Sequence, residues 1–195
     1  MAVEYELKFQ TTPAVLSAID RSIPVASTVY EMETVYYDTP SGALSDRRYT
    51  LRCRRENASH VCTLKTPAKK GRNEIELSCD NILDALDPLC EKSGIPDLKD
   101  ILKEGIRPVC GARFTRIAKT LNIPGGTIEL ALDQGVLLGG GKEIPLCEVE
   151  VELKDGTMEA TQAYGKALAL QFGLTPQPKS KFQRALALGK GESHG

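Results

Sequence analysis

The stretch that decides the fold is Val3-Glu4-Tyr5-Glu6-Leu7-Lys8-Phe9, close to the start of the chain. Apolar and charged residues alternate through it, so that Glu4, Glu6 and Lys8 share one side. Because successive side chains of a β-strand point to opposite faces, the alternation predicts a strand with one apolar and one charged face. Such a strand needs a covering layer over its apolar face.

The same alternation recurs along the chain in blocks that carry one sign of charge. Arginines alternate with apolar residues over 51–54, and glutamates do so over 74–77 and 147–153. Like charges two positions apart lie roughly 6.5–7 Å from each other on one face. At an effective dielectric of about 20 they repel by about 2 kcal/mol. Because a face that only met water would mix the two signs, the blocks indicate a ligand that neutralises them. Carboxylates bind divalent cations and basic side chains bind phosphates, so a metal-bound polyphosphate meets both demands.

The chain has 195 residues, with 25 basic and 26 acidic side chains and a formal net charge of −1. This length suits one domain, which we expect to cover residues 1–188 and to be followed by a flexible tail at 189–195. The balanced charge predicts neither a nucleic-acid nor a membrane partner. No apolar run approaches the ~18 residues that span a bilayer, and no signal-peptide core is recognisable.

The six cysteines are scattered, without a C-x-x-C pair. Cys53 and Cys147 fall on the apolar faces of predicted strands, where a free thiol behaves as a small hydrophobe. Reduced structural cysteines predict a cytoplasmic protein. We expect a monomer or a homodimer.

Eight strands are predicted, and at least seven of them set a charged or polar row against an apolar row. They lie at 3–9, 31–38, 49–56, 61–66, 74–77, 109–118, 127–134 and 147–153. Helices are predicted near 12–22, 80–105, 157–172 and from residue 179 onward. If helices cover the apolar rows, the charged rows face one another and the sheet curls into a charge-lined barrel. The alternative is an open sheet with one wet face.

Several motifs, taken in order, resemble the CYTH superfamily, the triphosphate tunnel metalloenzymes. Glu4-x-Glu6-x-Lys8 resembles its N-terminal signature. The further matching segments are Tyr36-Tyr37-Asp38-Thr39-Pro40, Leu51-Arg52-x-Arg54, Thr63-Leu64-Lys65, Glu74 with Glu76, Arg113, Glu148-x-Glu150-x-Glu152, and Ser180-Lys181 with Arg184. The resemblance covers roughly residues 1–188. It implies an α+β fold: a closed eight-stranded antiparallel β-barrel, or tunnel, with a charged interior and helices packed outside.

On this resemblance we expect a triphosphate site that uses Mg²⁺ or Mn²⁺. The expected metal ligands are Glu4, Glu6, Asp133, Glu148, Glu150 and Glu152. The expected phosphate-binding residues are Lys8, Arg52, Arg54, Lys65, Arg113, Lys179 and Lys181. Lys8, Glu4 and Glu6 are expected to be catalytic. Glu74 and Glu76 have auxiliary roles, either pairing with the basic residues or positioning water and a second metal.

The expected reaction is metal-dependent hydrolysis of inorganic triphosphate (tripolyphosphate) to phosphate and pyrophosphate. Alternatives on the same fold are a class IV-type adenylate cyclase and a thiamine or nucleoside triphosphatase. An alternative of another class is a non-catalytic polyphosphate-binding module. His60 lies in a predicted turn and His194 in the predicted tail, which argues against a histidine base. The run Gly139–Lys142 lacks the spacing of a nucleotide-binding phosphate loop and is interpreted as a hairpin turn.

Overall fold

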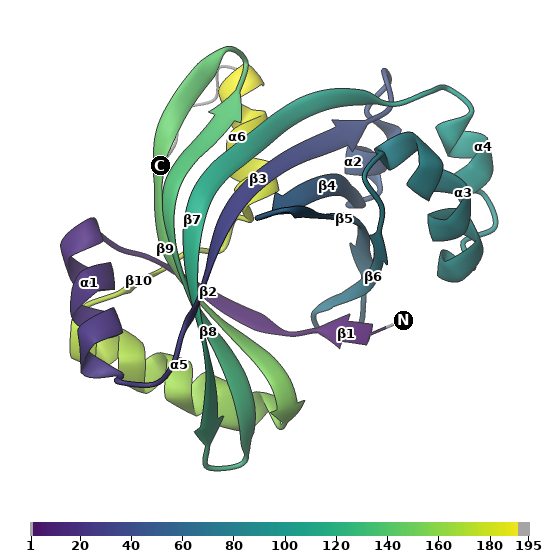
Figure 1. The fold of residues 1–195 in the computed structure, drawn as a ribbon. Coiled ribbons are helices and arrows are strands. Elements are labelled where there is room, and N and C mark those ends of the chain that lie inside the picture. The colour runs from purple at the N-terminus through teal and green to yellow at the C-terminus, as the bar shows by residue number, and fades with distance from the viewer. Residues whose placement is uncertain (1, 191–195) are drawn as a thin grey trace.

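The computed structural model describes residues 2–190 as a strongly curved antiparallel sheet with helices on both sides (Figure 1). The strands are β1 (Ala2–Glu4), β2 (Glu6–Gln10), β3 (Thr28–Asp38), β4 (Thr50–Glu56), β5 (Ser59–Pro67), β6 (Arg72–Ser78), β7 (Arg107–Ile123), β8 (Gly126–Gly139), β9 (Lys142–Gly156) and β10 (Thr175–Pro176). The helices are α1 (Pro13–Ser22), α2 (Ala43–Asp46), α3 (Ile82–Ser93), α4 (Leu98–Leu102), α5 (Met158–Phe172) and α6 (Lys181–Lys190). The predicted α+β class and the antiparallel sheet are confirmed.

The sheet order is β1-β6-β5-β4-β3-β7-β8-β9-β2-β10, so the two halves of the N-terminal strand lie toward opposite ends of the order. β2 pairs with β9 and β1 pairs with β6. Tyr5 joins the two halves; its carbonyl accepts a hydrogen bond from the Leu153 N–H at 2.9 Å. Figure 1 shows the chain crossing from one half to the other at this point. We call it the seam.

The expectation of a closed barrel needs correction at the seam. Within residues 2–190 no hydrogen-bonded ladder joins β1 to β2, because they are successive parts of one strand that changes partner. The covalent chain, and not a row of hydrogen bonds, bridges the gap. If β1 and β2 are taken as halves of one strand and the two-residue β10 is set aside, eight strands remain.

Two groups of helices cover the convex face, as the sequence predicts. α1 and α5 bury Leu16 and Leu168 against Phe9 and Val149 of β2 and β9. The approach of α5 is close: a Cβ on Gly165 would lie 2.5 Å from Leu7 Cδ1. Local signals start these helices, since the Thr12 and Thr157 side chains accept hydrogen bonds from helical N–H groups.

The second group covers the strands β4, β5 and β6. Leu51 and Leu64 pack with Leu89 of α3, Leu98 of α4 and Leu44 of α2. The outer rows of these strands are therefore buried, which leaves their charged rows on the concave side. No helix among the described residues is long and apolar enough to cross a membrane.

Helix α6 contradicts the expectation that all helices pack outside. It lies on the concave face (yellow in Figure 1), where Ala185 and Leu188 pack against Phe114, Leu137 and Leu146. The physical reason is that the inner rows of β7, β8 and β9 turn apolar at this end of the sheet. An apolar concave surface needs a cover, and α6 supplies it.

The turns agree with their sequence signals. Gly140 and Gly141, both with positive φ, form the turn between β8 and β9, which confirms that the glycine-rich run is a hairpin. Of the predicted tail, Gly189 and Lys190 are the last residues of α6. Residues 191–195 lie outside the described residues.

Candidate active site

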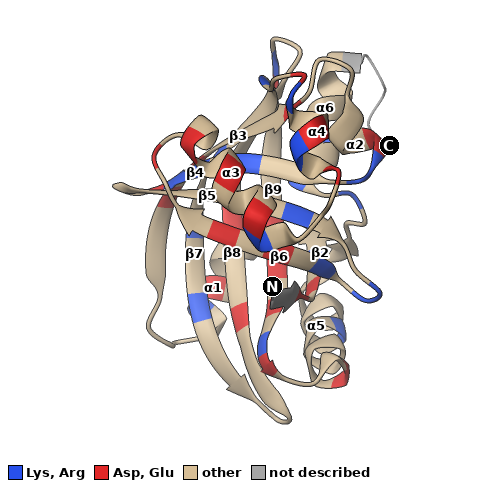
Figure 2. Cartoon of the chain, turned by 90° about the vertical axis from the view of Figure 1, so that its right-hand side faces the viewer, with Lys and Arg blue, Asp and Glu red and all other residues tan. Residues whose placement is uncertain are grey.

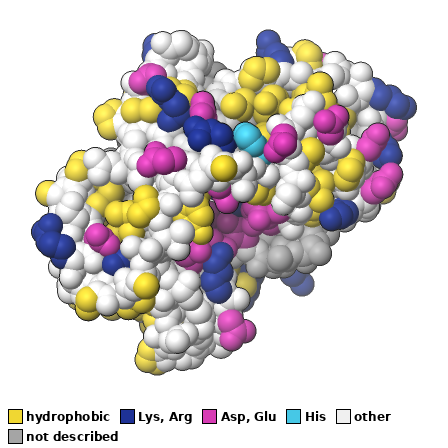
Figure 3. Space-filling model, viewed as in Figure 1, with side chains coloured by type: hydrophobic (Ala, Val, Ile, Leu, Met, Phe, Trp, Pro, Cys, Tyr) yellow, Lys and Arg dark blue, Asp and Glu magenta, His cyan; other side chains and the backbone are white. Residues whose placement is uncertain are grey.

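The concave face encloses a cavity of about 620 Å³ whose wall is mostly charged. Figure 2 shows acidic and basic bands on the strands in the middle of the molecule, and Figure 3 shows acidic side chains gathered in a hollow. The wall holds eight glutamates (Glu4, Glu6, Glu56, Glu74, Glu76, Glu129, Glu150 and Glu152). It also holds nine basic side chains (Lys8, Arg48, Arg52, Arg54, Lys65, Arg72, Arg116, Lys154 and Lys181).

Most residues predicted for the site do line this cavity. Their elements are β1 and β2 for Glu4, Glu6 and Lys8, β4 for Arg52 and Arg54, β5 for Lys65, β6 for Glu74 and Glu76, β9 for Glu150 and Glu152, and α6 for Lys181. The sheet register brings the rows together: Glu6 faces Glu152, and Lys8 faces Glu150. The alternation of the sequence therefore predicts the inner rows correctly on these strands.

One side of the cavity is held by ion pairs around Lys65. Its Nζ lies 2.5 Å from Glu4 Oε2 and 3.1 Å from Glu74 Oε1. Arg52 Nη2 lies 3.6 Å from the same Glu74 carboxylate and 3.8 Å from Glu76. Arg54 Nε donates to Glu56 at 2.7 Å. Because Glu4 belongs to β1, the Lys65 contact also fixes one side of the seam.

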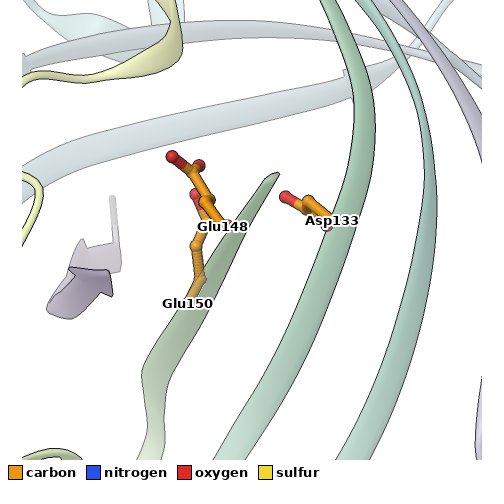
Figure 4. Close-up of side chains that lie close together, drawn as sticks. All are labelled: Asp133, Glu148 and Glu150. Atoms are coloured by element: carbon orange, nitrogen blue, oxygen red, sulfur yellow. The ribbon is translucent and has the colours of Figure 1, made fainter. Parts of the chain in front are cut away.

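The opposite side holds a buried acidic cluster of Asp133, Glu148 and Glu150, drawn in Figure 4. Carboxylate oxygens of the three lie within 4.8 Å of one another. Asp133 and Glu148 have no solvent exposure, so they lie beneath the cavity wall and do not line it. Like charges this close and this deeply buried require compensation.

Three basic side chains supply that compensation. Arg116 binds Asp133 through two 2.7 Å hydrogen bonds and also contacts Glu150 at 2.5 Å. Lys181 Nζ lies 2.8 Å from Asp133 and 2.7 Å from Glu150, and it contacts Glu148 as well. Arg184 of α6 pairs with Glu148 from the other side. Three acids thus meet three bases in one buried network.

Burial and charge act against each other on these groups. Burial alone would raise the pKa of Glu150, but Lys181 and Arg116 outweigh it and hold that pKa well below its usual range. Burial would lower the pKa of Lys181, yet the three carboxylates around it raise the pKa instead. Glu150 and Lys181 are therefore both charged across the physiological range.

The cavity-facing glutamates are less completely compensated. Burial raises the pKa of Glu152, and the charges of Glu4 and Glu129 raise it further, although Lys154 opposes them through a 2.8 Å contact. For Lys8, burial acts to lower the pKa, but the neighbouring Glu6 carboxylate at 2.7 Å raises it overall. Crowded carboxylates of this kind favour a bound cation.

Arg113 is not part of the site, which corrects the sequence expectation. Its side chain is 54% exposed on the outer face of β7, and its Nη2 pairs with Glu143 at 2.7 Å. The residue that does reach the site from this strand is Arg116, which the sequence analysis missed. The inner row of β7 contains Ala112, Phe114 and Arg116. Because two of these three residues are apolar, the sequence pattern indicates a row that packs in the core and not one that lines a charged cavity. The deciding signal is the register of Arg116 opposite Asp133, which a sequence alone does not give.

Lys179 is also outside the site. It is exposed, its backbone N–H donates to the Gln177 side chain at 3.1 Å, and it does not line the cavity. Lys181, at the start of α6, reaches inward instead. Other basic and acidic residues of the wall that the sequence analysis did not select are Arg48, Glu56, Arg72, Glu129 and Lys154.

The donor set fits a hard divalent cation in its chemistry, because it consists of carboxylate oxygens from β1, β2, β8 and β9. The buried acidic cluster has suitable spacing, but three bases already compensate it. Glu4, Glu6 and Glu152 line the cavity itself, where they pair with Lys65, Lys8 and Lys154, respectively. A cation held by them would lie within reach of a phosphate held by the arginines.

The structure is thus a curved antiparallel sheet whose concave face carries acidic and basic rows around one cavity, an arrangement consistent with the tunnel fold. The family model of the CYTH domain matches residues 2–186, and the chain belongs to this family. The resemblance stated from the motifs is thereby confirmed.

Similar proteins include a curated relative and two solved structures. The inorganic triphosphatase of Haemophilus influenzae is 26% identical over 97% of this chain and 56% of its own length, so the chain spans about half of that relative. A Hippeastrum protein, described as an adenylyl cyclase candidate with a dominant triphosphatase activity, has a TM-score of 0.71 at 19% identity, covering 97% of this chain and 96% of that one. An adenylate cyclase candidate from Bacillus halodurans has a TM-score of 0.65 at 17% identity, with 93% and 96% covered. At these identities the two structures show the shared fold.

Proposed function

We propose that this protein hydrolyses inorganic triphosphate to phosphate and pyrophosphate with Mg²⁺ or Mn²⁺. The observation that carries the proposal is the cavity wall, where Glu4, Glu6 and Glu152 share one cavity with Arg52, Arg54 and Lys65. A polyanion with a divalent cation matches both rows. The name of the Haemophilus influenzae relative agrees with this substrate.

The ion pairs of the wall suggest how substrate and cation are accepted together. Without ligand, carboxylates and basic groups neutralise one another, as in the Lys65–Glu4 and Lys8–Glu6 pairs. Phosphate oxygens would take over the basic partners, and the carboxylates so released would be free for the cation. Each ligand thus relieves the uncompensated charge that the other creates.

The roles of the chain's own residues follow from their positions. Arg52, Arg54, Lys65 and Lys181 would bind and orient the phosphate oxygens, with Arg116 holding the floor of the site. Lys8, beside Glu6, would stabilise charge that develops on the transferred phosphoryl group. Glu74 and Glu76, in contact with Arg52, would orient the arginine and a neighbouring water.

The metal ligands would be Glu4, Glu6 and Glu152, with Glu150 beside them. A cation held there supplies positive charge against the phosphate oxygens and polarises the phosphorus–oxygen bonds. Asp133 and Glu148, which are buried and paired, would act from beneath by holding Arg116, Lys181 and Arg184 in place.

A direct assay tests the proposal. Purified protein with Mg²⁺ or Mn²⁺ is offered tripolyphosphate, ATP and thiamine triphosphate in parallel, and phosphate release is followed. We expect the fastest release from tripolyphosphate and none without the metal. Cyclic AMP formed from ATP, or faster release from an organic triphosphate, would refute the assignment.

A matched pair of variants separates the site from the fold. Glu6→Gln should abolish turnover while circular dichroism and the unfolding midpoint stay close to wild type. Arg113→Gln removes a charge on the outer face and serves as the control with full activity. Full activity of Glu6→Gln would exclude the proposed metal site.

A further inference from the structure

Two basic residues of the cavity wall stand apart from the rest. Seven of the nine have a carboxylate oxygen within 4.0 Å. The exceptions are Arg48 and Arg72, for which no carboxylate lies that close within residues 2–190. Among the described residues, Arg48 and Arg72 are therefore the basic groups of the wall that form no direct ion pair.

The two arginines are neighbours beside the proposed triphosphate clamp, by which we mean the phosphate-binding residues Arg52, Arg54, Lys65 and Lys181. Arg72 Nη2 donates to the backbone carbonyl of Arg48 at 2.7 Å and to that of Lys65 at 3.0 Å. Lys65 in turn holds Glu4 at 2.5 Å. A ligand that reaches from Lys65 toward Arg72 would therefore leave the clamp and meet Arg48 next.

Arg72 retains unused hydrogen-bonding capacity. Its Nε is buried and has no hydrogen-bond partner among the described residues. A buried N–H donor without a partner is unfavourable, and a ligand oxygen could supply the missing acceptor. Both contacts of its Nη2 to the two carbonyls involve neutral groups, so the charge of Arg72 stays available to an anion.

Arg48 is held in place by an uncommon backbone conformation. Its φ of 59° lies in the left-handed region, which a residue with a Cβ adopts only when the surroundings impose it. The turn after α2 imposes it: the Arg48 N–H donates to the Ser45 carbonyl at 2.8 Å, and Asp38 accepts hydrogen bonds from the N–H groups of Leu44 and Ser45. The strain keeps an exposed arginine at the rim of the cavity.

We propose that Arg48 and Arg72 form a second anion subsite, which takes the fourth phosphoryl group of a linear polyphosphate longer than triphosphate. The inference rests on the proposed function, because it extends the triphosphate clamp by one position. Guanidinium groups suit this task, since their charge is permanent and their planar N–H groups match phosphate oxygens. The exposed Lys69 and Lys70, which lead into β6, add positive charge to the approach.

The test compares the affinities of tripolyphosphate and tetrapolyphosphate by calorimetry with metal-free protein, so that neither ligand is hydrolysed during the titration. Wild type should bind tetrapolyphosphate about tenfold more tightly, as expected for one added charge-assisted contact. In Arg48→Asn, whose side chain tolerates a positive φ, the ratio of the two dissociation constants should fall toward one. Arg72→Gln should act in the same direction.

Arg47→Asn is the matched control. Arg47 is the preceding residue, carries the same charge, pairs with Asp97 at 3.9 Å and does not line the cavity. Its ratio should equal that of wild type. The subsite would be overturned if the ratio of the two dissociation constants fell as far in Arg47→Asn as in Arg48→Asn, or if it did not change in Arg48→Asn. It would also be overturned if wild type bound both ligands with equal affinity. Binding without turnover in the metal assay would instead refute the proposed hydrolysis alone.

Discussion

Replacement of Arg116 by methionine tests the buried network most directly. The substitution keeps much of the side-chain volume and removes the charge that holds Asp133 through two hydrogen bonds and also contacts Glu150. Asp133 is fully buried, so the lost partner cannot be replaced by bulk water. Three carboxylates would then share Lys181 and Arg184.

The magnitude follows from that geometry. Breaking a buried ion pair by removing one partner lowers the free energy of unfolding by about 3–5 kcal/mol. For a chain of this length the midpoint of thermal unfolding should fall by roughly 6–20 °C. Urea unfolding followed by circular dichroism measures the change, with the slope checked for two-state behaviour.

Arg113→Met is the internal standard for this experiment. It removes the same charge from the same strand, but from an exposed pair with Glu143, so the loss should stay below about 1 kcal/mol. The double variant Arg116→Met with Asp133→Leu should recover most of the stability, because it leaves two acids facing two bases. If Arg116→Met is no more destabilising than Arg113→Met, the network does not support the fold as described.

Three further predictions follow from the same structure. Mg²⁺ should raise the affinity for a non-hydrolysable imido analogue of tripolyphosphate by about tenfold in calorimetry, since each ligand frees the partners of the other; equal affinities with and without Mg²⁺ would contradict the exchange of ion pairs. Burial raises the pKa of Cys62, and it raises the pKa of Cys110 to about 12. At pH 8 both thiols should therefore stay protonated and resist iodoacetamide in the folded protein but react in urea, and rapid labelling of the native protein would contradict these raised pKa values. Asp38→Ala should lower the free energy of unfolding by about 1–3 kcal/mol through loss of the bonds to Leu44 and Ser45, measured by urea unfolding, whereas exposed Asp46→Ala should change it little.

The sequence was most informative where charged residues alternate regularly with apolar residues along a strand. On β2, β4, β6 and β9 the alternation alone predicts which residues face the cavity, because period 2 fixes the face once one side is apolar. On β7 the rule failed, since the inner row contains Phe114 as well as Arg116 and the outer row contains Arg113. When both rows of a strand contain apolar and charged residues, as in β7, polarity alone does not show which row faces the cavity.

Long-range pairing was the second limit. No local sequence pattern around Arg116 predicts its contact with Asp133, because the two residues meet only through the register of β7 and β8. Likewise the expected phosphate-binding residues included both Lys179 and Lys181, and only the start of α6 decides that Lys181 points inward. The concave position of α6 itself depends on apolar residues from three strands, which no single stretch reveals.

The seam has a kinetic consequence. The pairing of β4 with β5 and of β8 with β9 joins neighbours in the chain, whereas Glu6 pairs with Glu152 near the other end of the folded domain. Closing so large a loop is entropically slow, so the strand formed by β1 and β2 should be among the last elements to dock. Until it does, the nascent sheet presents two unprotected edges, and the rate of this final docking sets how long they remain open to other chains.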